Sequence, residues 1–401
     1  MGAVQQTITS VKGFQTAGVS AGLKGDGALD FALIVSDGLC SAAGVFTTNR
    51  AKAAPVLLDQ EVLADHAAEI RAIAINTKCA NACTGEVGMA NAREMARLTA
   101  EGLGIRPEAV LVMSTGVIGT HLPMDKIKTG VEVAVHALGP KWDRAASAIL
   151  TTDTRPKTAS LTVTTASGAF TIAGIAKGAG MIAPNMATML SAIVTDGVLG
   201  ADALQAALRA AVDSTFNRVV VDGDMSTNDT VLLLANGASS VSPEIGAFTD
   251  ALRDVCDSLA RQVARDGEGA TKFVQVEVIG APNDGAAHQI ANTIATSPLV
   301  KTALYGGDAN WGRIIAAAGR SGVPVEPDRM TLWVHGTSSD APLCLFSAGL
   351  PADYSEEEAT AIMKGAEIAI ALDCAAGSGK ATVYTCDLSH DYVSINGHYR
   401  S

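Results

Sequence analysis

The fold class is decided by residues 158–195, TASLTVTTASGAFTIAGIAKGAGMIAPNMATMLSAIVT. The first half alternates threonine with valine, leucine and phenylalanine on both sides of a Ser-Gly turn, which is the period-two pattern of a β-hairpin. The second half holds several glycines together with Pro184 and Asn185, which disfavour a continuous helix. The two uncharged parts of this stretch, Thr158–Ala176 and Gly178–Thr195, are long enough to suggest membrane spans, but we interpret them as a buried hairpin and a core strand.

Helix and strand patterns continue on both sides of this stretch. Glu86–Glu101 carries apolar side chains at helical spacing and is followed by Gly102, which can end a helix. Val110–Met113 is an apolar strand that leads into the small turn Ser114–Gly116, where α/β proteins place ligand-facing groups. Further strands are expected at Asp30–Val35, Ala43–Thr47, Arg71–Ile75, Leu161–Thr165, Phe170–Ile175, Val219–Val221, Phe273–Val278, Thr331–Val334, Glu367–Leu372 and Thr382–Cys386, and helices at Asp202–Thr215, Phe248–Arg265, Ala287–Thr296, Gly312–Ala318 and Ser355–Met363. This alternation predicts a mixed α/β fold.

The charge and length of the chain limit its partners. A net charge of −12 argues against nucleic acid, because binding to phosphates requires clustered lysine and arginine. The 401 residues are enough for two domains, which favours an enzyme over a small module. The first residues, MGAVQQTITSVKGFQTAG, lack the basic start and apolar core of a secretory signal. We expect a cytoplasmic protein that acts on a small molecule and binds neither nucleic acid nor membrane.

The cysteines indicate neither disulfides nor a metal site. There are seven, an odd number, and the only close pair is Cys79 and Cys83. A large hydrophobic chain has little need for a disulfide framework, so reduced and mostly buried thiols are expected. No CxxC pair or HExxH helix offers metal-ligand spacing. The sequence therefore predicts no metal and no bound cofactor.

Thr188 is a candidate nucleophile on chemical grounds. A threonine hydroxyl attacks poorly unless a base lies beside it, and one solution is to free its own α-amine by cutting the preceding peptide bond. That cut requires a small, strained turn. The small Ala187, the nearby Pro184 and the glycine-rich approach permit such a turn.

The segment KGAGMIAPNMATML at Lys177–Leu190 is similar, nearly residue for residue, to the cleavage-site segment of ornithine acetyltransferases. These enzymes of arginine biosynthesis are also called glutamate N-acetyltransferases. Other similar stretches follow in order: STGVIG at Ser114–Gly119 with LPMDKI after it, TTDTRPK at Thr151–Lys157, STNDT at Ser226–Thr230, DGEGATK at Asp266–Lys272, SPLVKTALYG at Ser297–Gly306, NWGR at Asn310–Arg313 and the terminal SINGHYRS. Each motif alone is weak, but the ordered set is specific, and the chain is identified as a member of this family.

The resemblance implies an architecture. It implies a layered α/β/β/α arrangement with a second, smaller C-terminal α/β domain, as in the aminopeptidase and ornithine acetyltransferase-like fold. It also implies self-cleavage between Ala187 and Thr188, which gives an α subunit of residues 1–187 and a β subunit of residues 188–401. The two fragments would stay in one fold and assemble as an α2β2 heterotetramer. We place the structural domain boundary near residue 280.

The resemblance also implies a ping-pong reaction. Thr188 attacks the acetyl carbonyl of N-acetylornithine with its freed α-amine as base, and the acetyl-enzyme then transfers the acetyl group to glutamate. Thr115 and the backbone amide of Gly116 match the family's oxyanion hole, which stabilises the negative charge on the acyl oxygen. The strand-to-turn pattern places both residues at a strand end.

Substrate-binding positions are also implied by the resemblance. They are Thr154, Lys177, Thr188, Glu268, Asn396 and Ser401. An amino-acid substrate carries a carboxylate and an amine, so a site needs a cation on one side and a carboxylate on the other. Lys177 suits the α-carboxylate, Glu268 suits a side-chain ammonium, and Asn396 suits either group.

Three positions depart from the family pattern. Lys78-Cys79 stands where the family commonly has Gly-Asn, Met225 replaces a usual threonine, and Ala309 replaces a usual proline before NWGR. None of them is assigned to the chemistry. Lys78 would alter the charge preference near the substrate if it faces the pocket.

Two alternatives to a simple transferase remain at this stage. The chain could be an N-terminal-nucleophile aminopeptidase or amidohydrolase of related fold, in which water replaces glutamate, or an uncleaved and silent binding protein. Use of acetyl-CoA as a second acetyl donor also stays open, because no glycine-rich phosphate loop decides it.

Overall fold

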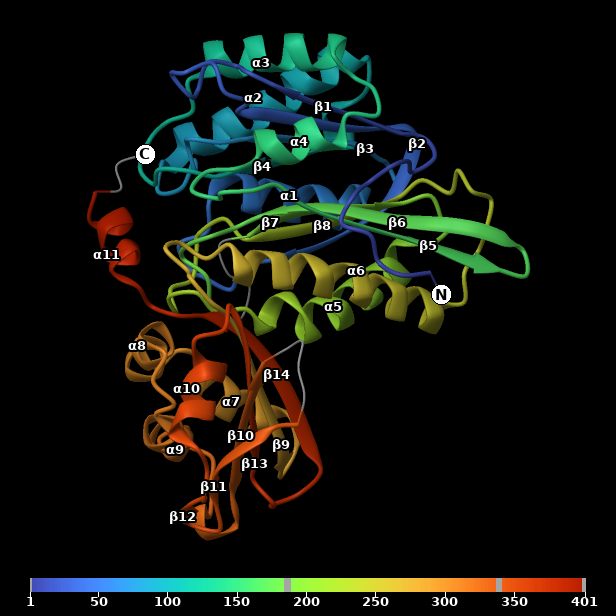
Figure 1. Ribbon diagram of the computed structural model, residues 1–401. Helices are drawn as coiled ribbons and strands as arrows, with labels where there is room; N and C mark the ends of the chain where they lie inside the picture. The colour runs from blue at the N-terminus through green and yellow to red at the C-terminus, as the bar shows by residue number, and fades with distance from the viewer. Residues whose placement is uncertain (1, 184–188, 337–340, 399–401) are drawn as a thin grey trace. The chain divides into compact units, whose positions relative to one another are not determined.

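The computed structural model describes residues 2–183, 189–336 and 341–398. The chain divides into two compact units, each with its own sheet (Figure 1). The first unit contains the described residues up to Asn217 together with Asp224–Val263, and the second contains Arg218–Gly223 and the described residues from Ala264 onward. Both units combine helices with a sheet, so the predicted mixed α/β class is confirmed.

The first unit is built on a sheet with eight described strands. They are β1 (Phe14–Val19), β2 (Phe31–Phe46), β3 (Ile70–Asn76), β4 (Val110–Ser114), β5 (Lys157–Thr165), β6 (Gly168–Lys177), β7 (Leu190–Thr195) and β8 (Thr230–Ala235). The main path runs in the order β4-β3-β2-β8-β7-β6-β5, and β1 pairs with β2.

The long strand β2 joins the two halves of this sheet. Its first half pairs with β1 and β3, and its second half pairs with β8. The register with β3 shifts between Val35 and Cys40, where the polar residues Ser36 and Asp37 interrupt the apolar run. The two short strands expected at Asp30–Val35 and Ala43–Thr47 are therefore the two ends of one strand.

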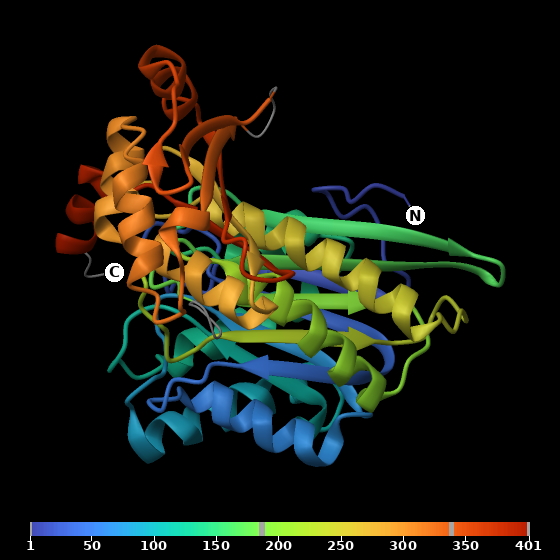
Figure 2. The same cartoon turned by 90° about the horizontal axis from the view of Figure 1, so that it is seen from below.

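Helices cover both outer faces of the sheet in this unit (Figure 1). They are α1 (Ala54–His66), α2 (Gly85–Leu103), α3 (Met124–His136), α4 (Trp142–Ala148), α5 (Ala201–Ser214) and α6 (Ile245–Arg265). The helices α2 and α3 lie outside the β1–β4 layer, and α5 and α6 lie side by side across the β5–β8 layer (Figure 2). The layer order α/β/β/α implied by the resemblance is confirmed.

Alternating side chains of β6 show how the layers pack. Ile175 belongs to the core cluster that also contains Ile34 and Ile73 from the other strand layer, and all three are almost fully buried. Gly174 points the opposite way, and a Cβ there would lie 3.2 Å from the Leu259 side chain on α6. One face of the strand thus packs on a sheet and the other on a helix, as expected for an inner layer.

The predicted hairpin and core strand are confirmed. The strands β5 and β6 pair antiparallel from Lys157↔Ala176 to Thr165↔Gly168. The strand β7 then pairs antiparallel with β6 and parallel with β8. Within the described ranges, no helix combines the length and apolar character needed to cross a bilayer.

The second unit is a smaller α/β structure, as the resemblance implied. Its strands are β9 (Phe273–Ala281), β10 (Thr331–Gly336), β11 (Leu343–Ser347), β12 (Leu350–Pro351), β13 (Glu367–Asp373) and β14 (Gly379–Cys386), and its helices are α7 (Asp284–Ala295), α8 (Pro298–Gly306), α9 (Trp311–Gly319), α10 (Glu356–Met363) and α11 (His390–Gly397). The strand order is β12-β11-β10-β13-β9-β14, in which β13 runs parallel to β9. The alternating helices and strands again match the sequence pattern.

Two expectations about this unit differ from the structure. The boundary between the units lies at Val263/Ala264 rather than near 280, because β9 pairs with β13 and β14 inside the second unit. The strand expected at Val219–Val221 is wrong. This run is too short for a ladder, and only Val219 forms a bridge, to Tyr384.

Candidate active site

Thr115 and Gly116 form a tight turn at the carboxyl end of β4. The amide of Thr115 donates to the carbonyl of Asn76 over 3.1 Å, which continues the parallel pairing of β3 and β4. Gly116 has a φ of 137°, and a Cβ there would lie 2.2 Å from the carbonyl carbon of Lys78. Only glycine fits at this position. Residues 114–116 are therefore held as a turn against the backbone of residues 78 and 79.

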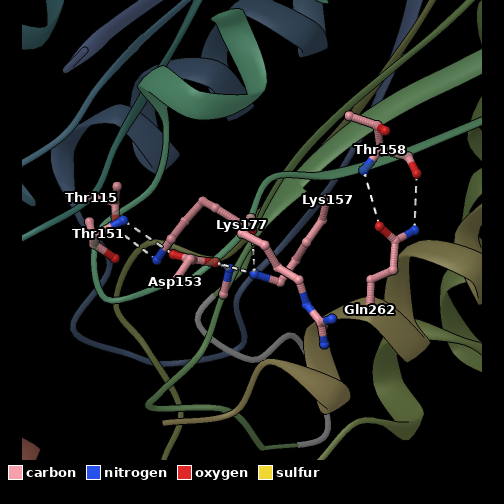
Figure 3. A network of polar contacts seen from close by, with 9 residues as sticks. Thr115, Thr151, Asp153, Lys157, Thr158, Lys177 and Gln262 are labelled. Carbon is pink, nitrogen blue, oxygen red and sulfur yellow. Dashed lines mark hydrogen bonds and ion pairs between the residues drawn. The ribbon is translucent and has the colours of Figure 1, made fainter. Parts of the chain in front are cut away.

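Lys177, at the end of β6, reaches this turn. Its Nζ lies 3.5 Å from Oγ1 of Thr115, and the side chain is buried (Figure 3). The structure thus brings together two residues that the sequence assigned to different roles, one to the oxyanion hole and one to substrate binding. The buried ammonium of Lys177 and the hydroxyl of Thr115 together form a positively charged, hydrogen-bonding surface that suits an anionic group.

Asp153 is the carboxylate that balances the positive charges of Lys177 and Lys157. Its Oδ1 accepts from Lys157 Nζ and from the amide of Gly178, each over 2.6 Å, and its Oδ2 accepts from the amide of Thr151. Burial alone would raise the pKa of this carboxyl, but the ammonium groups of Lys177 and Lys157 and the hydrogen bonds lower it to about 2. Asp153 is therefore ionised at neutral pH. No sequence pattern singled out Asp153, although it lies inside the matched TTDTRPK motif.

The other predicted substrate-binding residues are divided between the units. Thr154 follows Asp153 and is exposed in the loop before β5. Glu268 and Asn396 lie together in the second unit, where Nδ2 of Asn396 donates to Oε2 of Glu268 over 2.8 Å. Ala187, Thr188 and Ser401 lie outside the described residues.

Met189, which follows Thr188, is hydrogen-bonded to Asp229 and to the first residue of β8. Met189 donates its amide to Oδ1 of Asp229 over 3.0 Å, and its carbonyl accepts from the amide of Thr230. Burial raises the pKa of Asp229 well above its usual range, and the Met189 hydrogen bond and the charge of Lys177 offset only part of this effect. Asp229 was also missed, although it belongs to the matched STNDT motif.

Lys78 and Cys79 support the turn from the opposite side. Lys78 adopts a left-handed backbone with a φ of 69°, which suits the glycine common in the family better than a lysine. The Sγ of Cys79 donates to the carbonyl of Thr120 over 2.9 Å, and burial raises the pKa of this thiol. A raised pKa disfavours the thiolate, so Cys79 is a structural residue rather than a nucleophile.

The histidine, cysteine, aspartate and glutamate side chains of the described residues are dispersed. No group of three or more histidine, cysteine, aspartate or glutamate side chains lies within reach of one ion there.

Comparisons with known proteins match this chain over nearly its whole length. The model of the ArgJ family matches residues 15–401. A protein of Symbiobacterium thermophilum named arginine biosynthesis bifunctional protein ArgJ is 47% identical, over 98% of both chains. Its namesake from Geobacter sulfurreducens is 48% identical, over 98% of this chain and 100% of the relative. A crystal structure of the ArgJ protein of Bacillus halodurans is 43% identical, covers 51% of this chain and 96% of that chain, and has a TM-score of 0.48.

Proposed function

The chain belongs to the ArgJ family and is therefore an acyltransferase of arginine biosynthesis, and on that premise we propose that it transfers the acetyl group of N-acetylornithine to glutamate. The products are ornithine and N-acetylglutamate. The reaction passes through an acetyl group on the hydroxyl of Thr188. It begins only after the chain has cut itself between Ala187 and Thr188.

The contact of Lys177 with Thr115 is the observation that best supports this proposal. Lys177 also pairs with Leu190 in the register of β6 and β7, so the chain re-enters the sheet beside Lys177 two residues after Thr188. Adjacent Cα atoms are about 3.8 Å apart. Two such steps allow at most about 7.6 Å between the Cα atoms of Thr188 and Leu190, and the proposal puts the Thr188 hydroxyl at the turn and the cation.

This arrangement suits acyl transfer. The Thr188 hydroxyl attacks the acetyl carbonyl and gives its proton to the α-amine, while the carbonyl oxygen becomes negative. Donors from Thr115 and the Gly116 amide stabilise that oxygen, and one such donor is worth about 3–4 kcal/mol in a serine protease with the same kind of oxyanion hole. Collapse of the intermediate breaks the bond to the ornithine nitrogen, which takes the proton back. The amine of glutamate then attacks acetyl-Thr188 in the reverse sequence.

We assign the recognition of the substrate's charged groups to three residues. Lys177 would pair with a substrate carboxylate, because its buried ammonium group lies at the turn that carries Thr115. Glu268, held by Asn396, would pair with the ornithine ammonium. Each of these is a charge-assisted contact worth about 1.5–3 kcal/mol.

Intact-mass analysis with N-terminal sequencing tests the first step. The proposal expects two fragments, the second beginning at Thr188, and it expects Thr188→Ala to remain one chain without transferase activity. A wild-type chain that stays uncut and is fully active would overturn the self-cleavage mechanism. Free acetate released in stoichiometric amounts in the presence of glutamate would favour the hydrolase instead.

A second activity is supported by the word bifunctional in the names of the relatives. We propose that the chain also acetylates glutamate from acetyl-CoA. Incubating the purified enzyme with glutamate and acetyl-CoA alone should yield N-acetylglutamate, and yield no higher than background contradicts the assignment. An α2β2 heterotetramer of the two fragments in the cytoplasm completes the proposal, and sedimentation of the purified enzyme tests the assembly.

A further inference from the structure

Two adjacent residues, Asn228 and Asp229, contact both sides of the site in the first unit. They precede β8, and both side chains are buried. Each uses its side chain to hold backbone groups that are distant in the sequence. The matched STNDT motif contains them, but the transfer chemistry described above gives neither a role.

Asn228 holds the turn that carries Thr115. Its Nδ2 donates to the carbonyl of Ser114 over 2.8 Å and to the carbonyl of Ala80 over 2.7 Å. Its Oδ1 accepts from the hydroxyl of Thr227 over 2.6 Å. Ser114 directly precedes Thr115, so the amide of Asn228 fixes one end of the turn against the loop on the opposite side.

Asp229 holds the chain that follows Thr188. Its Oδ1 accepts from the amide of Met189 over 3.0 Å, and its backbone carbonyl accepts from the amide of Thr47 over 2.9 Å. That Met189 nitrogen is covalently bonded to the carbonyl carbon of Thr188. No described residue donates a hydrogen bond to Oδ2 of Asp229, although the side chain is fully buried. Among the interactions that lower the pKa of Asp229, the hydrogen bond from Met189 is the largest, ahead of those with Lys177, Thr47 and Ser226.

We propose that Asn228 and Asp229 act as one positioning unit, in which Asn228 sets the oxyanion turn and Asp229 sets the peptide that begins at Thr188. This inference rests on the proposed function. Asn228 and Asp229 are adjacent and directly precede β8. They therefore fix the distance between the oxyanion turn and the chain that follows Thr188. Misplacement of a reacting group by about 1 Å can cost about a hundredfold in rate.

Asp59 offers a matched control. It is also fully buried, its Oδ1 accepts from the amide of Val112 over 2.9 Å, and its Oδ2 receives no hydrogen bond from the described residues. Asp59 and Asp229 thus each accept a backbone amide and are equally buried, although Asp229 also interacts with Lys177, Thr47 and Ser226. They differ in the amide that they hold, since Val112 lies within β4 and Met189 directly follows Thr188.

The test uses alanine and asparagine variants of both aspartates in the full chain. Cell-free synthesis followed by intact-mass analysis gives the rate of self-cleavage, and kcat and KM are measured on cleaved enzyme per folded molecule. Asp229→Ala should slow cleavage and lower kcat by about tenfold or more, with KM changed by less than about threefold. Asp229→Asn keeps an accepting oxygen for Met189 and should restore both rates to within about threefold of wild type.

The controls separate positioning from general stability. Asp59→Ala should lower the melting temperature as Asp229→Ala does, while its rates per folded molecule stay within about threefold of wild type. Equal rates for Asp59→Ala and Asp229→Ala, or an Asp229→Asn as slow as Asp229→Ala, would overturn the inference. An uncut wild type rejects the proposed function itself, whereas a cut wild type with an equally fast Asp229→Ala rejects only the positioning role.

Asn228→Ala tests whether the two residues act together. It should also lower kcat, and the double variant should lose less than the sum of the two single losses in free energy, because residues of one unit are not additive. Additive losses would show that Asn228 and Asp229 act independently and would contradict the inference.

Discussion

Asp153 and Asp229 are two buried carboxyl groups that both interact with the charge of Lys177, yet their pKa values shift in opposite directions. Burial raises the pKa in both cases. Asp153 also pairs with Lys157 and accepts from the amides of Gly178 and Thr151, and its pKa falls to about 2. Asp229 accepts from the Met189 amide and also interacts with Thr47 and Ser226, yet its pKa stays well above the usual range.

This difference shows what decides the charge of a buried carboxyl group. One ammonium group nearby is not enough, since Lys177 acts on both aspartates. Asp153 lies near two ammonium groups, and the second one, Lys157, is in direct contact and helps to outweigh the effect of burial, whereas the hydrogen bonds to Asp229 do not. The first unit therefore holds an aspartate with a lowered pKa near the predicted substrate-binding lysine and one with a raised pKa that accepts from the amide of Met189.

Removing the charge of Asp153 should have the largest effect. Asp153→Asn leaves the fully buried ammonium of Lys157 without its carboxylate, and breaking a buried pair costs about 3–5 kcal/mol. Asp229→Asn removes no charge from the folded state and should cost less than about 1 kcal/mol. Urea unfolding of the two variants measures the contrast. Similar losses would mean that the two carboxyl groups do not differ in charge.

Replacing the shared lysine should have the next largest effect. Lys177→Met removes the cation that is proposed to meet the substrate carboxylate, so kcat/KM should fall by about a hundredfold, or about 2.7 kcal/mol. Lys157→Met is the matched control, because Lys157 also pairs with Asp153 but has no proposed contact with substrate. It should lose stability and keep kcat/KM per folded molecule. Equal losses of kcat/KM in both variants would remove Lys177 from the substrate site.

Much of the fold could be predicted from the sequence because the strands follow simple patterns. The hairpin β5–β6 alternates around a Ser-Gly turn, and local residues alone determine its pairing. The helix α1 was missed because the buried Asp59 interrupts its apolar face, so the sequence lacks a clear helical period. Where a polar residue is buried for a tertiary contact, the pattern fails.

The candidate site could be predicted only in part. Motif similarity pointed to Thr115, Gly116 and Lys177, and the structure brings Lys177 to Thr115. The roles of Asp153 and Asp229 could not be foreseen, because burial and partners from other segments set their charge. The amide that Asp229 holds lies 40 positions earlier in the chain. No local pattern records such a contact.

The smallest expected effect is a pair of opposite pH dependences in stability. The depressed pKa of Asp153 contributes stability that is complete well above its ordinary value of 3.8 and is lost as the pH falls toward about 2. A tenfold change in proton affinity is worth about 1.36 kcal/mol, so this contribution is on the order of 2 kcal/mol. The raised pKa of Asp229 acts in the other direction, since the folded state keeps a proton that the unfolded chain releases above about 3.9.

Unfolding free energies measured from about pH 3 to about pH 7 should separate the two aspartates. The difference between wild type and Asp153→Asn should shrink as the pH falls, because the wild-type carboxylate becomes protonated. The advantage of wild type over Asp229→Asn should instead shrink as the pH rises, because asparagine has no proton to release on unfolding. Asp59, whose pKa burial also raises, gives the same sign and serves as the control for Asp229. If both differences moved in the same direction with pH, the opposite charge states of the two aspartates would be refuted.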